Sequence, residues 1–214
     1  MSNPLSEAEI QALFTRADGQ FLCARWGRPI VPVVFGVTEE SLGTIKGAIE
    51  AVVALAGHKM AETDPELGAN LMVFFFRDWA ELRDVPHLDR MIDGLGPLVA
   101  RLEAAGANQY RVFRYDTARA IRAAFVFVRM DDALGEVALD VLALSQAVQV
   151  ILLWSDRAFT DRAALVRTDG PNPVTILRPE IAALIRAAYD PVLPAMATDP
   201  AHALRLHARL SPLQ

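Results

Sequence analysis

The stretch Glu136–Leu152, EVALDVLALSQAVQVIL, indicates how this chain folds. It is apolar nearly all the way round a helix, which is typical of a helix buried inside a protein. Its inner polar side chains are Ser145, Gln146 and Gln149. A strand-like run, Ala120–Met130, precedes it. We therefore expect a buried helix that follows a strand and carries few groups able to do chemistry.

The rest of the chain mixes strand and helix patterns without regular alternation, which favours the α+β class with a mixed sheet. Asn70–Phe76 is a continuous apolar run and predicts a central strand buried on both faces. Thr38 caps a predicted long helix that runs to about Lys59. We expect residues 1–214 to form a single compact domain. The other predicted elements are a hairpin of Gln20–Trp26 with Ile30–Val37, a strand pair of Gln109–Tyr115 with Ala120–Met130, a helical stretch Leu88–Ala105 kinked at Gly94–Pro97, and helices that begin at Pro179 and Pro200.

The composition and charge limit the classes of binding partner and the cellular compartment that we expect. The formal net charge of −5 argues against nonspecific nucleic-acid binding, which needs an excess of Lys and Arg. Cys23 is the single cysteine, so an intramolecular disulfide is excluded, and we interpret its side chain as a small buried hydrophobe. The apolar runs are shorter than the ~20 residues of a membrane span, and the start resembles no signal peptide. We expect a soluble cytoplasmic protein that does not bind a membrane.

Motifs for common chemistries are missing from the sequence. None of the four histidines belongs to an H-E-x-x-H pattern, and His202 and His207 are five residues apart, on different faces of a helix. The G-x-S-x-G elbow, the P-loop and the G-x-G-x-x-G fingerprint are also absent. We predict no metal and no cofactor.

Four arginines, Arg111, Arg114, Arg119 and Arg122, occur close to two tyrosines. Basic side chains beside aromatic ones can bind anions or nucleotides. Strand alternation, however, places Arg111 and Arg114 on opposite faces. We therefore favour a solvated hairpin over an anion site.

Four short motifs occur in order along the chain and together carry a resemblance. They are Trp26–Ile30 (WGRPI), Ala69–Phe74 (ANLMVF), Leu142–Val150 (LALSQAVQV) and Glu180–Leu193 (EIAALIRAAYDPVL). The chain resembles a family of uncharacterised, largely alphaproteobacterial proteins of unknown function. The family-like region spans about residues 26–193, and we expect residues 194–214 to form a C-terminal helical extension.

The resemblance implies a zincin-like, that is, metallopeptidase-like, layout. The family's helix at Leu142–Val150 is similar to a degenerate zincin helix, whose active form is H-E-x-x-H. Here Leu142, Ala143 and Gln146 stand where the first histidine, the glutamate and the second histidine would be. A peptidase activity is therefore not implied, because zinc chemistry needs those side chains.

Three hypotheses about function follow. The preferred one is a non-catalytic, metal-free, zincin-like scaffold that binds a protein partner or peptide. Its candidate ligand-binding residues are Ser145, Gln146, Gln149 and Glu180, although Gln146 could instead satisfy backbone groups in the core. The second is a hydrolase that uses carboxylates or an unrecognised metal held by Asp156, Glu180 or the histidines. The third is a homo-oligomer formed through the apolar C-terminal helices.

Overall fold

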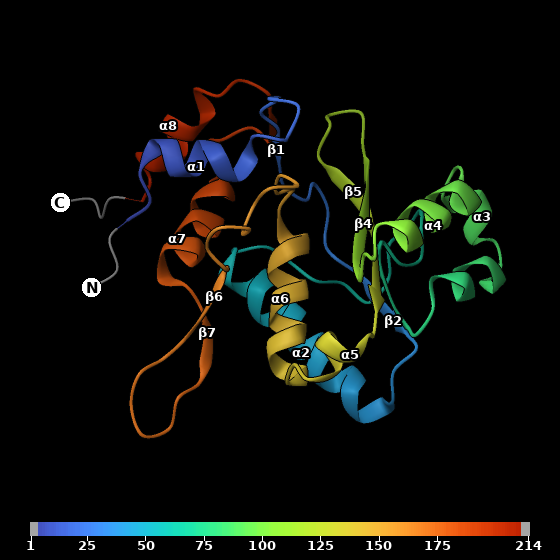
Figure 1. Cartoon of the computed structure of the whole chain (residues 1–214). Coiled ribbons are helices and arrows are strands. Elements are labelled where there is room, and N and C mark those ends of the chain that lie inside the picture. Colours follow the sequence, from blue (N-terminus) through green and yellow to red (C-terminus); the bar gives the residue numbers. More distant parts are fainter. Residues whose placement is uncertain (1–3, 211–214) are drawn as a thin grey trace.

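A four-stranded mixed sheet stands at the centre of the computed structural model, which describes residues 4–210 (Figure 1). The strand order is β2-β3-β5-β4; β2, β3 and β5 are parallel, and the edge strand β4 is antiparallel to β5. With helices on both faces, the fold belongs to the α+β class, as predicted. The strands are β2 (Pro32–Phe35), β3 (Leu71–Phe76), β4 (Gln109–Tyr115) and β5 (Ile121–Arg129).

Two long helices cover one face of the sheet and pack against each other (Figure 1). They are α2 (Glu39–Leu55) and α6 (Leu139–Ile151), and the short α5 (Asp132–Gly135) precedes α6. Thr38 caps α2, since its hydroxyl accepts a hydrogen bond from the Ser41 N–H (3.3 Å), as the sequence predicted. Val126 and Val128 of β5 face these helices, so the main core lies between them and the sheet.

The opposite face packs against a shorter helical segment (Figure 1). Phe125 and Phe127 of β5 point to this side, opposite to Val126 and Val128, because side chains alternate along a strand. The predicted helix Leu88–Ala105 is divided in two at Gly94, which has a left-handed φ of 69° that favours glycine. The elements here are the 3₁₀ helix η1 (Trp79–Asp84), α3 (Leu88–Met91) and α4 (Leu95–Ala104).

The remaining elements gather beyond α6 (Figure 1). The last helix begins at His202 and not at the predicted Pro200, and residues 1–3 and 211–214 of the predicted domain lie outside the described residues. The elements are α1 (Glu7–Phe14), α7 (Pro179–Ala188), α8 (His202–His207), and two small antiparallel pairs, β1 (Cys23–Ala24) with β8 (Met196–Ala197) and β6 (Leu165–Arg167) with β7 (Thr175–Leu177).

The predicted hairpin of Gln20–Trp26 with Ile30–Val37 is wrong. Its first segment pairs with β8, and its second pairs in parallel with β3. Between them the chain docks onto β5, because the Gly27 N–H donates to the Ile121 carbonyl (3.1 Å). Pairing between segments that are distant in the sequence therefore decides the strand partners here.

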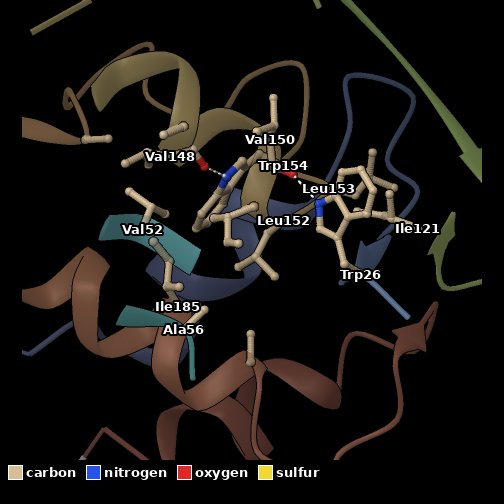
Figure 2. Packing of buried hydrophobic residues seen from close by; sticks show 14 of the residues in the cluster. Trp26, Val52, Ala56, Ile121, Val148, Val150, Leu152, Leu153, Trp154 and Ile185 are labelled. Carbon is tan, nitrogen blue, oxygen red and sulfur yellow. Dashed lines mark hydrogen bonds between the residues drawn. The ribbon is translucent and has the colours of Figure 1, made fainter. Parts of the chain in front are cut away.

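Aromatic side chains close the C-terminal end of α6 (Figure 2). The last four carbonyls of a helix lack partners within the helix. Here three of them accept hydrogen bonds from buried or half-buried aromatic residues, which fixes the end of the helix inside the core. The pairs are Trp154 Nε1 with the Val148 carbonyl (2.8 Å), Trp26 Nε1 with the Val150 carbonyl (2.8 Å) and the Tyr189 hydroxyl with the Ile151 carbonyl (2.8 Å).

Candidate functional site

The amide of Gln146 links α6 to the edge strand β4. Its Oε1 accepts a hydrogen bond from Arg111 Nη2 (2.7 Å), and its Nε2 donates to Gln109 Oε1 (3.0 Å). Arg111 Nη2 also donates to Gln109 Oε1 (2.9 Å), so the three side chains form a closed ring of hydrogen bonds. Gln146 is buried, and these bonds go to side chains of β4 rather than to backbone groups.

Arg111 is a partly buried cation without an acidic partner. No carboxylate among residues 4–210 lies within ion-pair distance of it, and its Nε is buried without an acceptor. Burial lowers the pKa of Arg111 to about 10, which leaves the guanidinium protonated at neutral pH. The prediction of a solvated hairpin is therefore wrong for Arg111, because α6 covers this side chain.

The other predicted site residues lie apart from this ring. Gln149 Nε2 donates to Ser145 Oγ one turn earlier (3.2 Å), and both side chains are half-buried. Glu180, in the first turn of α7, is buried and forms an ion pair with Arg162. No hydrogen bond or ion pair within the described residues joins Glu180 to the three candidates on α6.

The groups named in the hydrolase hypothesis occupy separate structural positions. Asp156 accepts a hydrogen bond from the Ala17 N–H (3.0 Å), and His58 Nε2 and His207 Nδ1 contact backbone carbonyls. Burial raises the pKa of the Cys23 thiol to about 12, far from that of a nucleophile at neutral pH. Within residues 4–210, no group of three or more His, Cys, Asp or Glu side chains is placed to hold a metal ion.

An apolar groove of about 470 Å³ lies on the sheet face that packs against α3. Met72 of β3 and Phe125 of β5 line it, together with two arginines and four large side chains that are 37–45% exposed. Such a concentration of exposed apolar surface is typical of an interaction site. The four exposed side chains are Phe35, Leu67, Met91 and Tyr115, and the arginines are Arg114 and Arg122.

A β-bulge in β5 lies beside this groove. Arg114 pairs with Ala123 but Tyr115 pairs with Ile121, so Arg122 is the extra residue, and Arg122 and its neighbour Ala123 both line the groove. Arg114 also donates from Nη2 to the Met91 carbonyl (2.9 Å), which ties β4 to the end of α3. The sequence shows no signal for the bulge, and strand alternation alone would place Arg122 and Ala123 on opposite faces.

Comparisons with known proteins give no relative from which the site can be interpreted. No protein-family model, no curated protein and no solved structure that was searched matches the chain. The zincin-like family therefore stays a prediction from the sequence. None of the helices formed by residues 4–210 has both the length and the apolar character needed to span a bilayer.

Proposed function

We propose that this chain is a metal-free, zincin-like scaffold that binds a segment of a protein partner and performs no reaction itself. Two helices on one face of a mixed sheet with an antiparallel edge strand are compatible with a zincin-like layout. On α6, the positions that would carry the first histidine and the glutamate are Leu142 and Ala143, both packed in the core. The third, Gln146, is engaged by β4.

The groove lined by Phe35, Leu67, Met91 and Tyr115 is the observation that carries the binding function. Its volume lies within the range of ligand-binding clefts, roughly 300–1,000 Å³, and aromatic and Met side chains are enriched where proteins meet. It runs beside β2, an outer strand with β3 as its one neighbour in the sheet. An apolar peptide segment of a partner protein fits this surface.

Charge argues against a second copy of the chain as the occupant. Arg114 and Arg122 line the groove, whereas the acidic Glu66 that pairs with Arg122 lies at its edge. In a two-fold dimer each groove would face its own copy, so these arginines would oppose like charges. A partner of different sequence avoids that repulsion.

Random-peptide display against the purified chain tests this function. We expect enriched peptides that bind the wild type and bind Leu67→Ser and Tyr115→Ser at least tenfold more weakly, since each change removes an exposed apolar contact. Leu204→Ser is the matched control, because Leu204 is 53% exposed on α8, outside the groove. Circular dichroism checks that each variant is folded. The proposal fails if no peptide is enriched, or if the groove variants bind as the wild type does.

A further inference from the structure

The loop before β3 places an acidic side chain and an apolar one at the edge of the groove. The Glu66 carboxylate accepts hydrogen bonds from Arg122 Nη2 (2.7 Å) and Arg28 Nη1 (3.3 Å). Leu67, the next residue, lines the groove itself. The chain therefore already presents a Glu-Leu pair to its own arginine and its own apolar surface.

This loop has a defined conformation. Asp64 Oδ1 accepts hydrogen bonds from the N–H groups of Glu66 (2.9 Å) and Leu67 (3.0 Å). The backbones of Asp64 and Gly68 pair in both directions, at 2.8 and 2.9 Å, and Gly68 has a φ of 70°. The turn thus sets the backbone position of Glu66, which does not depend on the contact of its side chain with Arg122.

Arg122 has unused capacity to bind an anion. Its Nη2 is bonded to Glu66, but its Nε is buried and has no acceptor among residues 4–210. Glu66 is 57% exposed and is shared with Arg28, and exposed ion pairs of this kind contribute little to stability. An incoming carboxylate can therefore displace Glu66 from Arg122 at small cost.

We propose, in an inference that rests on the proposed function, that the partner segment carries an acidic side chain next to a large apolar one. Its carboxylate replaces Glu66 on Arg122, while its apolar side chain lies against Leu67 and Phe125. Glu66 then acts as a built-in competitor that weakens binding of the acidic segment. Arg114, on the neighbouring strand and lining the same groove, adds to the positive charge that such a segment meets.

The test uses a peptide enriched by display on the wild-type chain and its counterpart in which each acidic residue is replaced by the corresponding amide. Fluorescence anisotropy measures both peptides on the wild type, Arg122→Gln and Glu66→Gln. Arg167→Gln is the control, since Arg167 is exposed on β6 and does not line the groove. The four combinations of peptide and Arg122 form a double-mutant cycle.

We expect the acid-to-amide change to weaken binding to the wild type about tenfold and to have little effect on Arg122→Gln. Glu66→Gln should tighten the acidic peptide at least threefold and leave the amide peptide unchanged. The inference is overturned if the enriched peptides are apolar without acids, or if the acid-to-amide effect is equal with and without Arg122. Either result leaves the proposed function standing, whereas the absence of any groove-dependent peptide removes both.

Discussion

Replacing Asn70 with alanine should strongly destabilise the fold beside the groove. Asn70 is fully buried at the start of β3 and joins three parts of the chain. Its Oδ1 accepts a hydrogen bond from the Val31 N–H (2.8 Å). Its Nδ2 donates to the Pro29 carbonyl (2.9 Å) and to Asp64 Oδ2 (3.0 Å). One side chain thus connects the entry to β2, the loop beside the groove and the central strand.

The magnitude follows from these three hydrogen bonds. Each contributes roughly 0.5–1.5 kcal/mol, and a buried group left without a partner costs roughly 1–3 kcal/mol. The N–H of Val31, which is 4% exposed, loses its partner, and the carboxylate of Asp64 loses a donor. We therefore expect Asn70→Ala to lower the free energy of unfolding by about 3–5 kcal/mol, a large fraction of the roughly 5–15 kcal/mol of a typical domain.

Urea denaturation followed by tryptophan fluorescence measures this change. Asn172→Ala is the control, because Asn172 is exposed and its substitution should stay within about 0.5 kcal/mol. Asn70→Asp keeps the shape but places a second carboxylate beside Asp64, so at pH 7 it should be at least as harmful. A loss below about 1 kcal/mol for Asn70→Ala would refute the argument that this network holds the loop.

Three further outcomes are expected. Burial alone would raise the pKa of Asp64, but its backbone, amide and guanidinium hydrogen bonds lower it to about 2, below the ~3.9 of an unfolded chain. Its contribution to stability should therefore be present above about pH 4 and be lost as the pH falls toward 2, and urea unfolding of Asp64→Asn should lack this part of the pH dependence. Cys23 should resist iodoacetamide at pH 8 until urea unfolds the chain, whereas rapid labelling of the folded protein would contradict its burial. Tyr189→Phe removes the hydrogen bond to the Ile151 carbonyl and should cost about 1–2 kcal/mol in the same urea assay; no loss would show that this cap is dispensable.

The sequence predicted the main elements where their patterns are long and strong. The apolar run Asn70–Phe76 contains β3, and Gln109–Tyr115 has the bounds of β4. Both patterns reflect burial of whole faces, which a single sequence records directly. The hairpin failed because strand partners are chosen by packing between distant segments, as in the pairing of Cys23 with Ala197.

The candidate site likewise has a local feature that the sequence shows and long-range contacts that it does not show. The sequence identified Gln146 as an inner polar residue of a buried helix, but its partners Arg111 and Gln109 come from a strand more than 30 residues away. Alternation assigned Arg111 a face of its strand and could not show that α6 would cover that face. A polar residue on a buried helix is thus visible in the sequence, whereas the group that satisfies it is not.

The sequence did not predict the groove, for a different reason. Its apolar side chains belong to strands and loops that alternation assigns to a core, and Arg122 lies in a bulge that alternation cannot predict. Met91, the last residue of α3 before the helix is interrupted at Gly94, is 37% exposed and lines the groove. A continuous helix over Leu88–Ala105 would follow a different path. The lining of the groove therefore includes residues next to one left-handed glycine and one bulge, which are features that sequence patterns record least well.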